Sequence, residues 1–215
     1  MIAANIEKIK QQIGQNVQLV AVSKTKPIEM LMEAYNTGQR IFGENKVQEM
    51  VAKYEQLPKD IEWHLIGHLQ SNKVKYIAPF VSLIHAVDSL KLLETINKEA
   101  IKNNRVIDCL LQIYIADEET KFGLDETELD ALIESDTYNQ MQNIRIVGLM
   151  GMATNTEDEN KIRNEFRKLK TLFNKFSILN SQFSILSMGM SSDYIIAVEE
   201  GSTMVRVGSS IFGER

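Results

Sequence analysis

The sequence predicts an α/β fold, a single (β/α)8 TIM barrel over residues 1–215. Eight short apolar runs alternate with segments of helical periodicity along the whole chain. Regular alternation of strands and helices predicts a parallel sheet, and eight such units favour a closed barrel. No linker or change in composition divides the chain, which indicates one domain. An open, doubly wound sheet is the alternative, because the number of strands is hard to fix from sequence.

The first half of the chain supplies four of the predicted strands. Isoleucines at positions 2, 6, 9 and 13 recur at helical spacing, so the chain opens with an amphipathic helix. Apolar runs predict strands at 17–23, 41–45, 61–66 and 81–87, and helical patterns lie between them at 28–35, 46–57 and 71–79. Pro27 suits a first helical turn, while Gly38 and Pro58 end the helices that precede them.

The second half continues the same alternation. Ser89 caps a helix over 89–100, and Asp125 caps a helix over 125–133 with Glu128 three residues later. A long helix covers 162–176, where apolar residues recur every three or four positions, and a short one covers 192–198. The remaining strands are predicted at 106–115, 144–150, 184–188 and 204–207.

Composition narrows the class of protein. The 215 residues are 44% hydrophobic and carry a net charge of -5, so no basic excess suits a dedicated nucleic-acid binder. Cys109 is the single cysteine, and its apolar neighbours predict a packed strand residue rather than a nucleophile. One cysteine allows no intramolecular disulfide, which fits a cytoplasmic protein. Without a signal-peptide core, a bilayer-spanning run or a long apolar stripe, we expect a monomer that does not associate with membranes.

Lys24 is the first candidate functional residue. It follows the apolar run 19–22 and would emerge at the carboxyl end of a buried strand, where TIM barrels carry their chemistry. A lysine amine in such a place can attack an aldehyde and form an imine. The alternative is that Lys24 and Lys26 are solvated loop residues. A barrel would gather the residues that end its strands around one pocket: Lys24, Asn45, Gly67, Asp88, Met150, Met188 and Gly208.

The last two strands indicate an anion site. Met188-Gly189-Met190-Ser191 echoes an earlier Met-Gly-Met segment at 150–152, and Gly208-Ser209-Ser210 follows the final strand. Barrel enzymes often bind phosphate in the loops after their seventh and eighth strands. Ser192 as an ordinary helix N-cap is the alternative. Arg206 either faces the interior, where its charge needs an acceptor, or pairs with a carboxylate outside.

Other chemistry is not supported. His64 and His68 are four residues apart, but a strand end and a glycine separate them, so the helical zinc motif is absent. The sequence has neither a Walker loop nor a Gly-x-Gly-x-x-Gly after the first strand, and it lacks the Gly-x-Ser-x-Gly elbow of many hydrolases. We therefore expect no metal site.

Five segments share their order and residues with a known family: 21–27, 42–45, 63–73, 187–191 and 201–208. They resemble the pyridoxal phosphate (PLP) homeostasis protein family, and the segment that runs from His64 through Lys73 is the most specific. The resemblance covers almost the whole chain. It implies a barrel like the N-terminal domain of alanine racemase, with PLP as the cofactor.

The resemblance also implies roles for individual residues. Lys24 corresponds to the imine-forming lysine, with Lys26 as the alternative amine, and Arg206 to the arginine that faces the pyridine nitrogen. Further cofactor-binding positions are Asn45, His64, Met188, Ser191, Gly208 and Ser209, of which the last three correspond to a phosphate cradle. Lys121 corresponds to another lysine near the mouth.

The function implied is PLP homeostasis without catalysis. Lys24 would hold PLP reversibly for release, and PLP-dependent apoenzymes are the candidate recipients. The alternative is an amino-acid racemase or lyase, but related racemases use a second β-domain and a tyrosine from a partner subunit. We expect no such domain after this barrel. A scaffold barrel that binds no cofactor is the third possibility.

Overall fold

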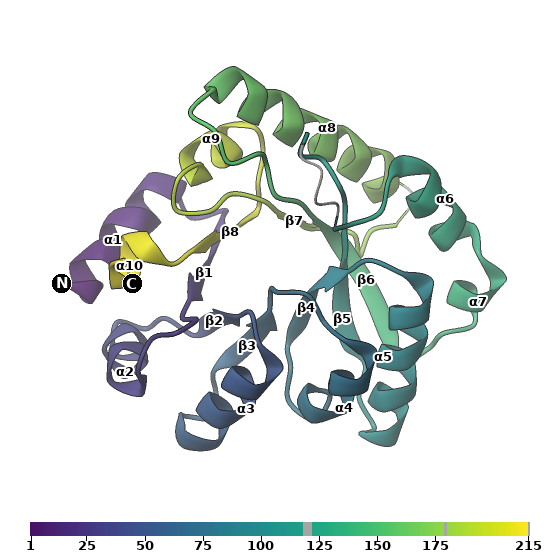
Figure 1. Cartoon of the computed structure of the whole chain (residues 1–215), viewed down its shortest axis with the longest axis horizontal. Coiled ribbons are helices and arrows are strands. Elements are labelled where there is room, and N and C mark those ends of the chain that lie inside the picture. Colours follow the sequence, from purple (N-terminus) through teal and green to yellow (C-terminus); the bar gives the residue numbers. More distant parts are fainter. Residues whose placement is uncertain (118–121, 179, 215) are drawn as a thin grey trace.

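Eight parallel strands close into a barrel, as the sequence predicts (Figure 1). The computed structural model describes residues 1–117, 122–178 and 180–214. The strands are β1 (Gln18–Val22), β2 (Ile41–Glu44), β3 (Glu62–Leu65), β4 (Leu83–Val87), β5 (Ile107–Gln112), β6 (Ile144–Met150), β7 (Ile185–Ser187) and β8 (Met204–Val207). Each strand pairs with the next one along the chain, and β8 pairs with β1 through partners such as Val20 and Arg206.

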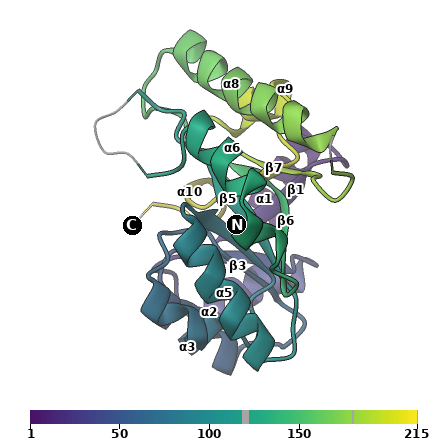
Figure 2. The ribbon, with the colours of Figure 1, turned by 90° about the vertical axis from the view of Figure 1, so that its right-hand side faces the viewer.

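Helices surround this barrel and cover its outer face (Figure 1). The longer ones are α1 (Ile2–Ile13), α2 (Ile28–Asn36), α3 (Val47–Gln56), α5 (Leu90–Lys102), α6 (Glu126–Glu134) and α8 (Glu159–Ser177). Short helices are α4 (Val74–Ile77), α7 (Asp136–Asn139), α9 (Tyr194–Glu199) and α10 (Ser209–Phe212). Figure 2 shows α8 and α9 on one side of the barrel and α3 and α5 on the other.

Several boundaries differ from the sequence prediction. Residues 71–79 form a 3-10 turn, Ser71–Lys73, and then α4, and the Ser71 side chain caps neither of them. The fifth strand ends at Gln112 because Ile113 forms an isolated bridge with Leu124. The short helices α7 and α10 were not predicted, since four residues are too few to show a helical period.

The apolar core has two parts. The larger part lies between the strands and the helices, and it includes the four isoleucines of α1 and the aromatic pair Phe42 and Trp63. The smaller part contains strand residues alone and fills the barrel interior: Val20, Leu83, Ala86, Leu110, Val147, Met150 and Met204. This interior layer supports the carboxyl ends of the strands from below.

The two ends of the described chain lie close together (Figure 1). Helix α1 contacts α10, and the Asn5 side chain donates a hydrogen bond of 3.0 Å to the Ile211 carbonyl. Together with the β1–β8 pairing, this contact holds residues after β8 beside the turn that follows β1.

Candidate functional site

A cavity of about 630 Å³ lies at the carboxyl ends of the strands. Its lining includes six of the cofactor-binding residues proposed from sequence: Lys24, Asn45, Ser191, Arg206, Gly208 and Ser209. The other lining residues are Val22, Ile66, Gly67, His68, Gln112, Phe122, Met152, Met190, Ser192 and Ser210. Lys121, also singled out from sequence, lies outside the described residues.

Three of the strand-end residues expected around this pocket do not line it. Met150 is fully buried in the barrel interior, and Met188 is fully buried in the outer core, since side chains alternate between the two faces of a strand. Asp88 is not among the lining residues, and its carboxylate lies 3.7 Å from Nδ1 of the lining residue His68. The expectation that Met188 faces the pocket is therefore wrong for its side chain.

Lys24 and Lys26 have different surroundings. The half-buried Lys24 lines the cavity. Lys26 instead donates hydrogen bonds to the carbonyl oxygens of Gly213, at 2.8 Å, and Glu214, at 3.1 Å. The intervening Thr25 has a φ of 64°. Of the two amines that the sequence leaves open, the structure directs Lys24 to the pocket and ties Lys26 to the end of the chain.

Arg206 faces the barrel interior, which decides between the two orientations considered from sequence. Its Nη1 donates to the Ser187 carbonyl at 2.9 Å and to Ser187 Oγ at 2.5 Å, and its Nη2 donates to the Gly151 carbonyl at 3.1 Å. Burial lowers the pKa of Arg206 to about 10, although the nearby Asp193 acts in the opposite direction. Arg206 is therefore a fixed cation at neutral pH.

Two histidines continue this hydrogen-bonded chain below the pocket. His85 Nδ1 lies 3.0 Å from Ser187 Oγ, and His85 Nε2 lies 3.0 Å from His64 Nδ1. Burial lowers the pKa of His64 to about 3 and holds that of His85 well below its ordinary value, so both rings are neutral at neutral pH. His64, proposed from sequence as cofactor-binding, thus lies beneath the lining and connects to Arg206 through His85 and Ser187.

The loops after β7 and β8 meet at Ser191. Its Oγ accepts hydrogen bonds from the backbone N–H groups of Gly208, at 3.1 Å, and Ser210, at 3.5 Å. Two backbone donors therefore converge on this hydroxyl in the cavity wall, and its own hydrogen remains available to a ligand oxygen. Ser192 is not a helix cap, because α9 begins after Asp193, whose carboxylate accepts from Met190 N at 2.6 Å.

Close backbone contact shapes another part of the wall. A Cβ atom on Gly67 would lie 2.4 Å from the Asn45 carbonyl oxygen. Glycine at this position lets the loop after β3 pass directly against the end of β2, which places Asn45 in the lining.

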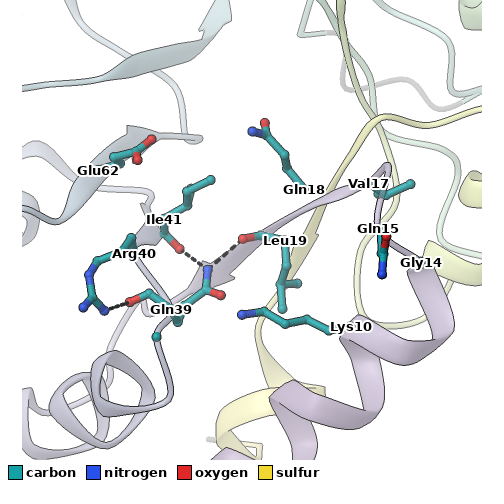
Figure 3. Close-up of a pocket in the computed structure, with 11 residues that line it drawn as sticks. Lys10, Gly14, Gln15, Val17, Gln18, Leu19, Gln39, Arg40, Ile41 and Glu62 are labelled. Carbon is teal, nitrogen blue, oxygen red and sulfur yellow. Dashed lines mark hydrogen bonds between the residues drawn. The ribbon is translucent and has the colours of Figure 1, made fainter.

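A second cavity, of about 410 Å³, lies at the amino-terminal ends of β1, β2 and β3 (Figure 3). Gln39 Nε2 donates there to the carbonyls of Leu19, at 2.7 Å, and Ile41, at 2.8 Å (Figure 3). These contacts join strand ends, so we assign this cavity a structural role. Within the described ranges, no three His, Cys, Asp or Glu side chains are placed to share a metal ion.

No helix in the described part of the chain combines the length and the apolar character that a membrane span needs.

Comparison with known proteins agrees with the geometry. The family model for the alanine racemase N-terminal domain matches residues 1–215. The pyridoxal phosphate homeostasis protein of Aquifex aeolicus is 42% identical over 205 residues, which cover 94% of this chain and 89% of that protein. Its human counterpart is 41% identical over 211 residues, with 92% and 76% covered.

Solved structures show the same fold. PipY of Synechococcus elongatus, solved with PLP bound, has a TM-score of 0.89 and 37% identity over 99% of this chain and 100% of its own. Alanine racemase from Bartonella henselae has a TM-score of 0.72 at 18% identity, covering all of this chain and 60% of its own, so that likeness concerns the fold alone. The chain belongs to the pyridoxal phosphate homeostasis protein family and has the barrel of the alanine racemase N-terminal domain.

Proposed function

We propose that this protein binds PLP at the mouth of its barrel and serves PLP homeostasis as a non-catalytic carrier. The observation that carries the proposal is the convergence of the Lys24 amine, the Arg206 guanidinium and the Ser191–Gly208 turn on one cavity. Family membership and the PLP-bound PipY structure support the same cofactor.

The residues of the cavity match the chemical groups of PLP. Bound PLP supplies an aldehyde, which condenses reversibly with an amine and releases one water. Lys24 provides the amine within the lining. The hydroxyls of Ser191 and Ser209 provide donors for a phosphate, and the N–H groups of Gly208 and Ser210 orient Ser191 by donating to its Oγ. We assign Asn45 to polar contact with the cofactor from the opposite wall.

Arg206 favours storage over catalysis. A guanidinium donates hydrogen bonds and accepts none, so a ring nitrogen that faces it has to accept and stays unprotonated. An unprotonated pyridine is a weaker electron sink for a carbanion. Ser187 and Gly151 hold two of the guanidinium nitrogens, which orients Arg206 for this contact.

Lysine modification tests the assignment. PLP added to the pure protein should give the absorbance of a covalent lysine adduct, and borohydride should fix the cofactor onto Lys24, as located by mass spectrometry. Lys26→Ala should behave like the wild type, because Lys26 binds the Gly213 and Glu214 carbonyls. Lys24→Ala should lose the signal. Unchanged absorbance in Lys24→Ala, with no label moved to Lys26, would contradict the proposal.

The alternative function is an amino-acid racemase or lyase. Besides Lys24 and Arg206, His68 is the titratable side chain in the described lining, and its side chain is 53% exposed. The loaded protein should exchange no amino-acid α-proton in deuterated water beyond the rate with free PLP. Exchange that requires the protein, and that His68→Gln abolishes, would establish the enzymatic alternative.

We further propose a monomeric, single-domain protein of the cytoplasm that releases PLP to PLP-dependent apoenzymes. The lone cysteine, Cys109, is buried, and one family model covers residues 1–215. Loaded protein should restore activity to a PLP-dependent apoenzyme in the presence of a scavenger of free PLP. Restoration that the scavenger abolishes would mean that transfer passes through free PLP.

A further inference from the structure

A buried ionic cluster lies directly beside the turn that carries Lys24. Lys53, on α3, is only 5% exposed. Its Nζ donates three hydrogen bonds of 2.7 Å each, to the carbonyl of Ser23, to Glu44 Oε1 and to Glu49 Oε1. An ammonium has three N–H donors, so all the hydrogen-bonding capacity of Lys53 is used within this cluster.

The cluster holds the backbone on both sides of Lys24. Before it, the Ser23 carbonyl accepts from Lys53, and Ser23 Oγ donates to Glu44 Oε1 at 2.6 Å. After it, the Thr25 N–H donates to Glu49 Oε1 at 2.6 Å. The residues next to Lys24 are therefore fixed from the α3 side, while Lys24 itself lines the cavity.

The turn needs such support because its backbone is strained. Thr25 has a φ of 64°, in the left-handed region that β-branched residues rarely adopt. A conformation of this kind is unfavourable for a residue other than glycine and persists where the surroundings impose it. Thr25 donates its backbone N–H to Glu49, which the Lys53 ammonium holds in turn. The ionic cluster is thus bonded directly to the residue with the unusual backbone conformation.

Fold stability alone does not account for this cluster. Glu44 is fully buried, and its Oε2 has no hydrogen-bond partner in the described structure. Burial raises the pKa of Glu44, and the hydrogen bond from Lys53 acts in the opposite direction. Buried ion pairs often stabilise a fold no better than apolar residues of similar size do. A role at the neighbouring turn explains why charged groups occupy this position.

We propose that Lys53, Glu44 and Glu49 are positioning residues, which fix the strained turn at Ser23 and Thr25 so that the Lys24 amine is held at the site of covalent attachment. The inference rests on the proposed function, because it concerns the same amine. It adds a role for α3 and β2, whose side chains here do not line the cavity.

Two ligands separate positioning from general damage. PLP carries the aldehyde that reacts with Lys24, whereas pyridoxine 5′-phosphate has the same ring and phosphate but no aldehyde. Glu49→Ala removes the acceptor for the Thr25 N–H, and Glu49→Gln keeps an acceptor oxygen there. Glu55→Ala, at an exposed position of the same helix, is the matched control. Lys53→Met tests the centre of the cluster.

Glu49→Ala and Lys53→Met should slow covalent attachment of PLP by about ten- to a hundredfold, since small displacements of a reacting group have effects of this size. Their affinity for pyridoxine 5′-phosphate should stay within about twofold of the wild type. Glu49→Gln should recover most of the rate, and Glu55→Ala should match the wild type. If Lys53→Met does not fold, the Glu49 pair decides the question.

The positioning role would be overturned if Glu49→Ala lowered the affinity for pyridoxine 5′-phosphate as much as it slowed the attachment of PLP. An unchanged attachment rate in Glu49→Ala would overturn it as well. Absence of any borohydride-fixed PLP on Lys24 in the wild type would instead contradict the proposed function, and this inference with it. The two failures are therefore distinguishable in one set of measurements.

Discussion

The Arg206 guanidinium donates to the hydroxyl of Ser187 across 2.5 Å, and this contact joins the pocket to the polar interior of the barrel. Because Arg206 can only donate, the Ser187 oxygen accepts there, and the Ser187 hydrogen is free to point to His85 Nδ1 at 3.0 Å. A ring that accepts at Nδ1 donates at Nε2, toward His64. The charge of Arg206 thus orients a chain of neutral groups beneath the cavity.

In the ligand-free protein, Ser187→Ala should lower the free energy of unfolding. The change removes an acceptor from Arg206 and the partner of His85 Nδ1, and both groups are buried. Arg206 keeps the carbonyls of Ser187 and Gly151 as acceptors, whereas His85 Nδ1 is left unpaired. One unpaired buried polar group costs about 1–3 kcal/mol, so the free energy of unfolding in urea should fall by about that amount. Ser184→Ala, at an exposed position just before β7, should change it little. If both substitutions lowered the free energy of unfolding equally, the hydrogen bonds of Ser187 would not contribute to stability as described.

Acid should destabilise the fold through the two buried histidines. The pKa of His64 falls from 6.5 to about 3 on burial, and that of His85 is also lowered. A histidine with a depressed folded pKa contributes stability above pH 6.5 and loses it as the pH falls, because the unfolded chain binds the proton more tightly. Each should contribute a slope approaching about 1.4 kcal/mol per pH unit below 6.5.

Urea unfolding between pH 7.5 and 5 measures this slope. Glu44, whose pKa burial raises, has the opposite sign, since its contribution is present at low pH and is lost as the pH rises through its folded pKa. It therefore reduces the slope. A free energy of unfolding that stays constant over this range would show that the buried histidines do not titrate as described.

Gly67→Ala should damage the pocket through the backbone. The added Cβ would lie 2.4 Å from the Asn45 carbonyl oxygen, so one of the two segments has to move. Overpacking of this kind costs about 1–3 kcal/mol, and PLP affinity should fall as well because both residues line the cavity. Asn45→Ala removes side-chain atoms without this clash and should lower affinity with little loss of stability. If Gly67→Ala bound PLP with wild-type affinity, Gly67 and Asn45 would not form part of the PLP-binding cavity.

Cys109 should be inert in the native protein. Its side chain is fully buried, and burial raises the pKa of the thiol, so the reactive thiolate is scarce at neutral pH. A coloured thiol reagent should label it in denaturant and not in buffer. Rapid labelling of the folded protein would mean that β5 opens readily or that its packing differs.

The sequence predicted the barrel and the position of Lys24 for a physical reason. Buried parallel strands appear as continuous apolar runs, and a lysine directly after such a run must lie at the strand end. The same apolarity hides which face each side chain occupies. Ser187 is the last residue of β7 and Met188 directly follows it. The Ser187 side chain belongs to the hydrogen-bonded network inside the barrel, whereas the Met188 side chain lies in the outer core.

Contacts between polar residues that lie far apart in the chain could not be predicted from the sequence. His85 and Ser187 are 102 positions apart, and no local pattern pairs them. Each of these polar residues stands in an otherwise apolar strand, which indicates a buried polar contact but does not say with which residue. Lys53 sits in a helix where lysine ordinarily faces solvent, so its burial follows only from the placement of Glu44 and Glu49.

The junction between β1 and β8 has a consequence for local unfolding. No short connection joins these strands, because they come from opposite ends of the sequence, and their pairing, as between Ala21 and Val207, completes the ring. Lys24 follows one strand and Arg206 belongs to the other, so a molecule held by both spans the junction. Occupancy would then slow hydrogen exchange of backbone amides along both strands relative to the empty protein.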